Sequence, residues 1–211
     1  MNRTPAKSKR EEILAAVVRV IIDVGFTDMT VGDVAQRVGI STSLVHYHFD
    51  SKSALITAAL RVALEDDKSW RQAIADGPGT AVQRLDRMLC GSLPGHTTDD
   101  ASWVMWIETW GEARRDEGIR ALMIEQIEHE REIVLGLLAV GEADGAIDCP
   151  DHPSTASRLM ALRDGLAVEH TLFEASGPAD TMVARLRTSM YVELGTVDGG
   201  RRAAARGRAK R

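Results

Sequence analysis

The sequence of 211 residues predicts an all-α fold. Through most of the chain, apolar residues recur at the three- and four-residue spacing of amphipathic helices. Residue pairs typical of helix starts precede several of these segments, and glycine or proline follows them. No segment shows the strict alternation of apolar and polar residues that is typical of a half-buried strand. Helices are therefore expected to form the whole core.

The first helix is expected from about residue 10 to residue 25. Ser8 and Glu11 have the spacing of a capping box, in which each side chain satisfies a backbone N–H group of the other residue. Apolar residues then follow the helical period until a glycine ends the helix. Thr30 and Asp33 form a second capping box, which starts a shorter helix.

The sequence GDVAQRVGISTSLVHYHFDSKSAL, residues 32–55, predicts two short helices around a glycine turn and the start of another helix. Gly39 stands where the first of these helices must stop, because glycine adopts a left-handed backbone without a Cβ clash. Ser41 can cap the next helix, residues 42–48. This pattern is a helix-turn-helix, whose second helix usually lies in the DNA major groove. An ordinary helical corner is the alternative, but it leaves the polar face of the second helix without a use.

The second helix of this motif carries side chains that suit DNA. The hydroxyls of Thr42 and Ser43 can bond base edges or phosphates, and the leucine that follows can touch a thymine methyl group. His46 and Tyr47 can donate to phosphate oxygens. His48 can do the same, or it can be a packed imidazole that braces the turn. The residues predicted to contact DNA are Thr30, Ser41, Thr42, Ser43, Leu44, His46, Tyr47, His48 and Lys52.

These motifs resemble the DNA-binding signature of the TetR family of bacterial one-component repressors. The resemblance covers roughly the first sixty residues. The HYHF motif, together with ALRDGL at residues 161–166, is also similar to the subgroup around the choline–betaine regulon repressor. The segments that carry the family resemblance are TVGDVA at 30–35, GIS at 39–41, VHYHF at 45–49 and the Ser-Lys pair at 51–52.

The resemblance implies a homodimeric regulator that binds double-stranded, palindromic operator DNA and releases it when a small molecule binds. It also implies that Thr30, Tyr47 and Lys52 contact the DNA backbone. Lys52 suits this role on physical grounds as well, because it lies where a helix is expected to begin and the free N–H groups there attract phosphate.

Charge is unevenly distributed along the chain. Residues 1–61 carry 8 Lys and Arg and 6 Asp and Glu, whereas residues 62–197 carry 12 basic and 24 acidic residues. Residues 198–211 carry 6 basic residues and one acidic residue. An acidic body is repelled by phosphate, which suits a protein that presents one end to DNA. Solubility alone would explain the acidic body equally well.

The predicted domains follow from these patterns. Residues 1–61 form the helix-turn-helix domain, residues 62–197 form a helical domain for effector binding and dimerisation, and residues 198–211 form a basic, disordered tail. The boundary is expected inside a helix that runs from residue 52 to about residue 75, without a flexible linker. Further helices are expected at about 79–93, 100–115, 117–143, 153–176 and 178–195.

The last two helices carry apolar stripes, which predict a dimer interface. In the TetR family the last two helices form such an interface, and a two-fold dimer presents its recognition helices to consecutive major grooves. The alternative is that both stripes belong to the core of one chain. The residues predicted for dimerisation are Leu159, Leu162, Leu166, Phe173, Met182, Val183, Leu186 and Met190.

Three of the nine aromatic residues share one face of a single expected helix, because Trp103, Trp106 and Trp110 are three and four residues apart. Three indoles beside a carboxylate can form a cage for an alkylammonium ion. Asp164 and Glu169 are the carboxylates expected to complete the cage. Plain core is the alternative for this stripe, and a neutral, lipid-like or aromatic effector is also compatible with it.

Other classes of protein find less support. No motif of a hydrolase, a metalloprotease or a phosphate-binding loop occurs, so no enzyme, cofactor or metal site is expected. The segments Glu128-His129-Glu130 and Asp148–His152 are interpreted as a charged helix face and a polar loop. A non-specific DNA binder that uses both basic ends remains the other alternative.

The composition indicates a globular protein of the cytoplasm. Apolar residues make up 44% of the chain, yet no run approaches the length of a membrane span. The first ten residues are basic and lack the apolar core of a secretory signal. Cys90 and Cys149 are expected to be free thiols.

Overall fold

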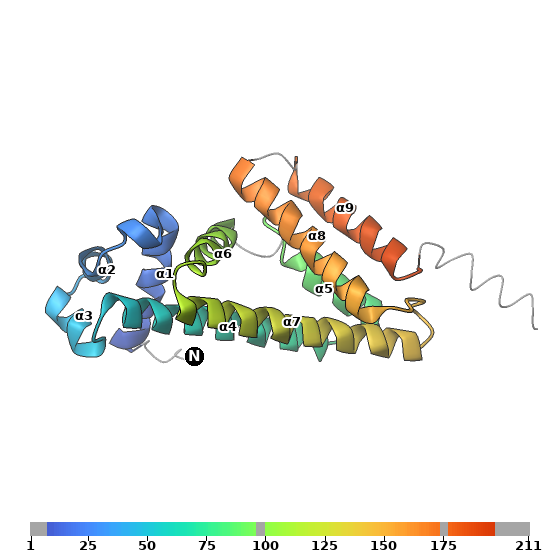
Figure 1. The fold of residues 1–211 in the computed structure, drawn as a ribbon, viewed down its shortest axis with the longest axis horizontal. Coiled ribbons are helices and arrows are strands. Elements are labelled where there is room, and N and C mark those ends of the chain that lie inside the picture. The colour runs from blue at the N-terminus through green and yellow to red at the C-terminus, as the bar shows by residue number, and fades with distance from the viewer. Residues whose placement is uncertain (1–7, 96–99, 174–176, 197–211) are drawn as a thin grey trace, which may run out of the picture. The chain divides into compact units, whose positions relative to one another are not determined.

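The computed structural model describes residues 8–95, 100–173 and 177–196, and these residues fold into α-helices (Figure 1). The predicted all-α fold is confirmed. The predicted tail at 198–211 lies outside the described residues, as do the last residues of the helix predicted at 153–176. The helices are α1 (Lys9–Asp28), α2 (Val31–Val38), α3 (Thr42–His48), α4 (Lys52–Ala75), α5 (Ala81–Gly91), α6 (Asp100–Glu112), α7 (Glu117–Ala143), α8 (His152–Phe173) and α9 (Ala179–Glu193).

The starts of the first helices are fixed by side chains within three residues of each cap. Ser8 Oγ accepts a hydrogen bond from the backbone of Glu11, whose carboxylate accepts one from the backbone of Ser8. Thr30 and Asp33 make the same reciprocal pair at the start of α2. Ser41 caps α3. Both predicted capping boxes and the predicted serine cap are therefore confirmed.

The first helix is interrupted at the predicted place. Gly25 has a non-helical backbone, with φ 79° and ψ 172°, but one more helical turn follows it within α1. The chain resumes a helical turn up to Asp28, and the backbone N–H of Met29 donates to the Gly25 carbonyl oxygen. Phe26 and Met29 are only 6% and 1% exposed, so burial of these apolar side chains accounts for the extra turn.

Two compact units make up the described chain. The first contains residues 8–69 and 104–127, and the second contains residues 70–103 and 128–196. All three divisions fall inside helices, namely α4, α6 and α7. The first unit therefore contains the predicted DNA-binding domain together with the end of α6 and the start of α7, a grouping that the sequence did not suggest.

The first unit has one continuous hydrophobic core. Fully buried residues from α1, such as Ile13 and Ile21, pack with Val34 of α2, Leu55 and Leu60 of α4 and buried residues of α7. Two side-chain pairs between α4 and α7 lie beside this core: Lys68 with Glu125, and Asp67 with Gln126.

In the second unit, α5 packs against α8 and α9, which also pack against each other. Arg187 of α9 pairs with Asp86 of α5 at 2.6 Å. Arg158, near the start of α8, pairs with Glu193 at the end of α9, also at 2.6 Å. Because opposite ends of α8 and α9 meet in this pair, the two helices run antiparallel.

A buried group of charges joins three helices of the second unit. Glu130 of α7 is 4% exposed and lies between Arg71 of α4 and Arg163 of α8. Its carboxylate accepts hydrogen bonds from Arg71 Nη1 at 2.5 Å and from Arg163 Nη2 at 3.1 Å. Burial raises the pKa of Glu130, but the guanidinium groups of Arg163 and then Arg71 outweigh it and lower the pKa. The interpretation of this segment as a charged surface is therefore wrong for Glu130.

The two cysteines are free thiols, as expected, and both are buried. Burial, followed by the nearby carboxylate of Asp86, raises the pKa of Cys90 to about 12, so this thiol stays protonated at neutral pH. None of the described helices has the length and apolar character needed to cross a membrane.

Candidate nucleic-acid interface

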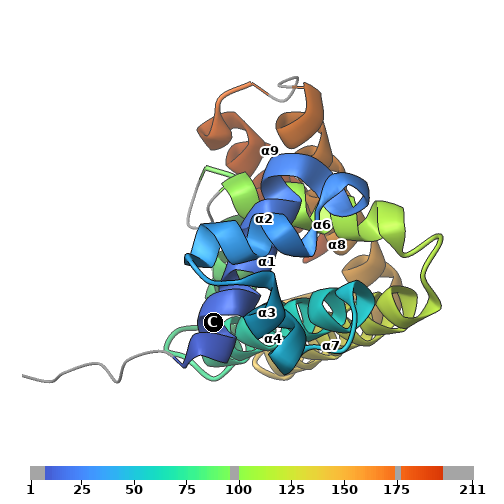
Figure 2. The same cartoon turned by 90° about the vertical axis from the view of Figure 1, so that its left-hand side faces the viewer.

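The turn between α2 and α3 sets the direction of the recognition helix (Figure 2). Gly39 has φ 72° and ψ 39°, and its N–H group donates back to the last turn of α2. The backbone N–H of Ile40 donates to the Ala35 carbonyl oxygen at 3.0 Å. Val45, 1% exposed, and Phe49, 6% exposed, then hold α3 against the core of the first unit. This motif is thus a helix-turn-helix with one apolar anchor and one free face.

The free face of α3 carries the predicted DNA-contacting side chains. Thr42, Ser43 and His46 are exposed, and Leu44 is half-buried. Tyr47 is 82% exposed, so its hydroxyl and ring extend away from the core. Exposure of these side chains makes them available to base edges and phosphates, as the sequence predicts.

His48 occupies a different environment from His46. It is half-buried, and its ring lies 5.3 Å from the ring of Tyr47 and 6.3 Å from that of Phe49. The guanidinium group of Arg10, in α1, lies 5.2 Å from the Phe49 ring, within the range of a cation–π contact. These contacts support the alternative interpretation of His48, as an imidazole that braces the end of α3.

Three of the residues predicted to contact DNA lie at helix starts. Thr30 and Ser41 are exposed N-caps, of α2 and α3 respectively. Lys52 begins α4 and is half-buried, and its Nζ donates to the Thr27 carbonyl oxygen at 3.4 Å. Hydrogen bonds from Thr30 keep the pKa of Asp33 below its usual value, and the charge of Lys52 contributes in the same direction.

Sequence reasoning missed two basic residues that support the helix-turn-helix. One is Arg10, beside the Phe49 ring, and the other is Arg37 of α2, which forms an ion pair with Asp23 of α1. The only sequence signal was a basic residue on an otherwise amphipathic helix, which does not identify its partner. Both contacts fix α2 and α3 relative to α1.

Six of the eight residues predicted for dimerisation are buried within a single protomer. A side chain that is already covered loses no further area when a second protomer binds, so these six residues stabilise the packing of α8 and α9 themselves. Leu162 is half-buried, whereas Phe173 is 69% exposed. The six buried residues are Leu159, Leu166, Met182, Val183, Leu186 and Met190.

The apolar surface that α8 and α9 leave exposed lies at their ends. Leu172 and Phe173 end α8, with 51% and 69% exposure, and Tyr191 and Val192 end α9, with 37% and 60% exposure. The sequence did not single out Leu172, Tyr191 or Val192, because spacing alone does not tell which side of a two-helix layer faces the core.

The tryptophan stripe is divided between the two units. Trp103 belongs to the second unit, is 5% exposed, and donates its indole N–H to the Ser92 carbonyl oxygen at 2.6 Å. Trp106 and Trp110 belong to the first unit and pack, partly buried, against its hydrophobic core. For these two residues the packing supports the interpretation as core.

The two predicted cage carboxylates lie on α8, in the second unit. Asp164 accepts hydrogen bonds from its neighbour Arg163, through Nε at 2.9 Å and Nη2 at 2.6 Å. Glu169 is exposed. A cationic ligand would therefore have to compete with Arg163 for Asp164, whereas Glu169 lies at the surface.

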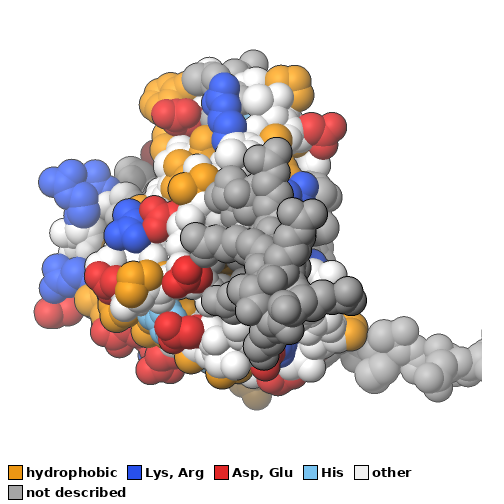
Figure 3. All heavy atoms as spheres, turned by 90° about the vertical axis from the view of Figure 1, so that its right-hand side faces the viewer, with side chains coloured by type: hydrophobic (Ala, Val, Ile, Leu, Met, Phe, Trp, Pro, Cys, Tyr) orange, Lys and Arg blue, Asp and Glu red, His pale blue; other side chains and the backbone are white. Residues whose placement is uncertain are grey.

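The face drawn in Figure 3 shows hydrophobic, acidic and basic side chains interspersed. The described residues of that face form no continuous basic surface. Among the described residues as a whole, histidine, cysteine and acidic side chains form no group of three or more with the placement of a metal site.

Comparisons with known proteins match both parts of the chain. Residues 13–59 match the family model of bacterial regulatory proteins of the tetR family. Residues 81–192 match the model of the C-terminal part of BetI-type transcriptional repressors.

Individual relatives agree with these matches over most of their length. The chain is 27% identical over 177 residues to the HTH-type transcriptional regulator BetI of Rhizobium meliloti, covering 83% of this chain and 84% of the relative. It is 28% identical over 190 residues to BetI of Burkholderia thailandensis, covering 88% and 92%.

Solved structures share the fold. A transcriptional regulator from Saccharomonospora viridis, in complex with choline, superposes with a TM-score of 0.80 at 26% identity, covering 87% of this chain and 95% of the other. A transcriptional regulator from Rhodococcus sp. Rha1 has a TM-score of 0.77 at 22% identity, covering 89% and 97%.

Proposed function

Because the chain belongs to the TetR family of transcriptional regulators, with a C-terminal part of the BetI type, we propose that it is a homodimeric repressor that releases a palindromic operator when a small amine binds. The observation that carries the proposal is the free face of α3. Its exposed hydroxyl, imidazole and phenol groups stand on a short helix that the buried side chains of Val45 and, directly after the helix, Phe49 anchor to the core.

The proposed contacts divide into two kinds. Thr42 and Ser43, in the first turn of α3, reach base edges, where short hydroxyls can distinguish bases. Tyr47 and Lys52 bind phosphates, and the N-terminus of α4 adds its partial positive charge to that of Lys52. Phosphate contacts position the protein without reading sequence, so the two kinds predict different effects on specificity.

The proposed dimer uses the exposed ends of α8 and α9. In an isologous interface, a two-fold axis that crosses the middle of antiparallel helices brings the end of α8 in one protomer to the end of α9 in the other. Phe173 would then contact the partner's Val192, and the same contact would occur twice. In this arrangement the six buried residues of the predicted interface would not contact the partner, and would stabilise the two helices that form the interface.

The proposed effector is a quaternary or alkyl amine. Support comes from the Saccharomonospora viridis regulator, which is in complex with choline. In this chain Glu169 and Asp164 of α8 are the proposed carboxylates, and Trp103 is the proposed aromatic wall. Asp164 also accepts hydrogen bonds from Arg163, with which the amine would compete.

The test measures binding of fluorescent operator and random duplexes at several salt concentrations. Tyr47→Ala should weaken binding to both duplexes alike, whereas Thr42→Ala should reduce the preference for operator, by about 1–3 kcal/mol for a lost base contact. Lys52→Ala should lower the salt dependence by about one released ion. If wild-type protein binds both duplexes equally, the protein is a non-specific binder and the repressor proposal is wrong.

The effector part of the test adds choline and its uncharged carbon analogue, 3,3-dimethylbutan-1-ol. Choline should release the operator and the analogue should not, because only the cation gains from a carboxylate and an aromatic wall. Glu169→Gln should weaken the response to choline while leaving DNA binding unchanged. Equal release by both compounds would show that the effector site recognises shape rather than charge.

A further inference from the structure

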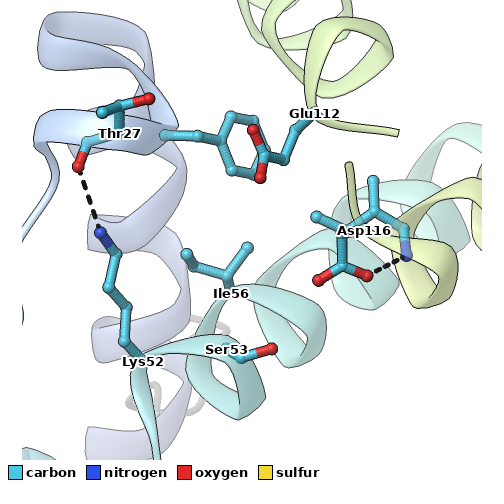
Figure 4. Close-up of a pocket in the computed structure, with 8 residues that line it drawn as sticks. Thr27, Lys52, Ser53, Ile56, Glu112 and Asp116 are labelled. Atoms are coloured by element: carbon cyan, nitrogen blue, oxygen red, sulfur yellow. Dashed lines mark hydrogen bonds between the residues drawn. The ribbon is translucent and has the colours of Figure 1, made fainter. Parts of the chain in front are cut away.

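The first unit contains a cavity beside Lys52 (Figure 4). Its volume is about 400 Å³, which is within the range of small-molecule sites. The end of α1, the start of α4, the end of α6 and the start of α7 each contribute to it. The residues that line it are Phe26, Thr27, Lys52, Ser53, Ile56, Glu112, Asp116 and Ile119.

Opposite charges enter the cavity from different sides. Lys52 lines it from the start of α4, with its Nζ at the Thr27 carbonyl oxygen, whereas Glu112 and Asp116 line it from the end of α6 and from just before α7 (Figure 4). Between them lie the apolar side chains of Ile56 and Phe26, both buried in the core of the first unit. The cavity therefore has a positive end, a negative end and an apolar floor.

The charged side chains can make further hydrogen bonds to a ligand. Lys52 Nζ has three donors, and its contact with the Thr27 carbonyl oxygen is long, at 3.4 Å. Glu112 pairs with Arg115 at 3.2 Å, but the Arg115 side chain is 72% exposed, and such surface pairs are weak.

Asp116 has a structural contact as well. Its Oδ1 accepts a hydrogen bond from the backbone of Ile119 at 2.9 Å, in the first turn of α7. A carboxylate can accept further bonds at its second oxygen. Asparagine at this position would keep the bond to the backbone and remove the charge.

We propose that this cavity binds a small zwitterion, with its carboxylate at Lys52 and the first turn of α4 and its ammonium group between Glu112 and Asp116. The start of a 24-residue helix adds a partial positive charge to the carboxylate end. A simple anion would be repelled by the two acidic side chains, and a simple cation by the lysine. Only a molecule with both charges is matched at both ends.

This site has a consequence for DNA, which rests on the proposed phosphate contact of Lys52. The ligand carboxylate and an operator phosphate require the same ammonium group. The two ligands therefore exclude each other at Lys52, and each lowers the affinity for the other by the same factor. The zwitterion would thus weaken DNA binding from within the DNA-binding unit.

The experiment titrates the full-length protein, without DNA, with ω-amino acids from glycine to 6-aminohexanoate, and follows binding by calorimetry. Butanoate and butylamine carry the two charges separately and serve as controls. At least one amino acid should bind, and both controls should bind about tenfold or more weakly, since each lacks one set of charge-assisted bonds. Equal binding of butanoate or of butylamine, or no binding of any amino acid, would overturn the proposal.

Variants locate the site. Lys52→Met, Glu112→Gln and Asp116→Asn should each weaken binding of the amino acid about tenfold. Lys9→Met and Glu117→Gln, which change exposed charges at helix starts outside the cavity, should leave it unchanged. Circular dichroism checks that each variant is folded. If Lys52→Met does not fold, the result for Glu112→Gln decides the outcome. Binding that survives Glu112→Gln and Asp116→Asn together would place the ligand elsewhere.

A second measurement distinguishes the zwitterion site from the proposed phosphate contact of Lys52. The best amino acid is added to the complex with operator DNA. Release of the DNA supports competition at Lys52. Binding of the amino acid without release would leave the zwitterion site standing and show that Lys52 does not contact phosphate.

Discussion

At the scale of single residues, Glu130 is a buried charge whose partners come from two other helices. It is 4% exposed, and two arginines from different helices donate to it. Removing a carboxylate from such a group leaves both guanidinium groups buried without their partner. The carboxylate therefore holds α4, α7 and α8 together within the second unit.

Glu130→Gln should lower the free energy of unfolding by about 3–5 kcal/mol. Glu128→Gln, on the same helix but exposed, should change it by less than about 0.5 kcal/mol. Denaturation by urea at pH 7 measures both. A loss for Glu130→Gln as small as that for Glu128→Gln would mean that the buried pairs contribute little to stability.

The pH dependence has a definite sign. Burial raises the pKa of Glu130, but Arg163 and Arg71 lower it more, so the folded value lies below the unfolded one. The stabilisation is therefore complete above the unfolded pKa, about 4.3, and is lost as the pH falls through the folded value. Wild-type stability should fall more steeply than that of Glu130→Gln as the pH is lowered below about 4.5.

At the scale of elements, the turn between α2 and α3 depends on one backbone conformation. Gly39 has φ 72°, and a Cβ added there would meet no atom within 4 Å. A substitution at this site is therefore unfavourable because of the left-handed backbone and not because of a clash. The free space lets the backbone effect be measured by itself.

Gly39→Ala should destabilise the first unit by about 1 kcal/mol. Gly111→Ala is the matched control, because it also meets no atom within 4 Å but lies in helix α6 of the same unit. There alanine should be neutral or stabilising, by up to about 1 kcal/mol. Thermal unfolding compares the two variants; a loss of stability for both would point to hidden steric contacts instead.

At the scale of the whole molecule, the proposed dimer places the two recognition helices on one operator. Its predicted interface contains Phe173 and Val192, which stand at opposite ends of the α8–α9 pair and are both well exposed. Because each residue occurs twice in a two-fold interface, a charge introduced at either end would also occur twice.

Phe173→Glu and Val192→Glu together should weaken dimerisation by about tenfold or more, while the helical content stays the same. Ile124→Glu is the control, because Ile124 is an exposed apolar residue of α7, 49% exposed, outside the proposed interface. Sedimentation velocity over a range of concentrations measures the dimer. Dissociation caused by Ile124→Glu instead would move the interface to α7.

The sequence by itself determined the features that depend on neighbouring residues. Both capping boxes, the left-handed Gly39 and the exposed polar face of α3 all arise within a few residues, so local spacing predicts them. The same locality made the family signature recognisable over the first sixty residues. The extra turn after Gly25 was not predicted, because the burial of Phe26 and Met29 depends on the rest of the first unit.

Only the tertiary structure decided which side of each apolar stripe faces a neighbour. It buried Met182 and Leu186 within one protomer and left Val192 exposed, and it divided the tryptophan stripe between two units. It also placed Glu130 beside Arg71 and Arg163, which are 59 and 33 residues away in the chain. The physical reason is common to all of these: helical periodicity gives a face its character, but the packing of distant helices determines what that face contacts.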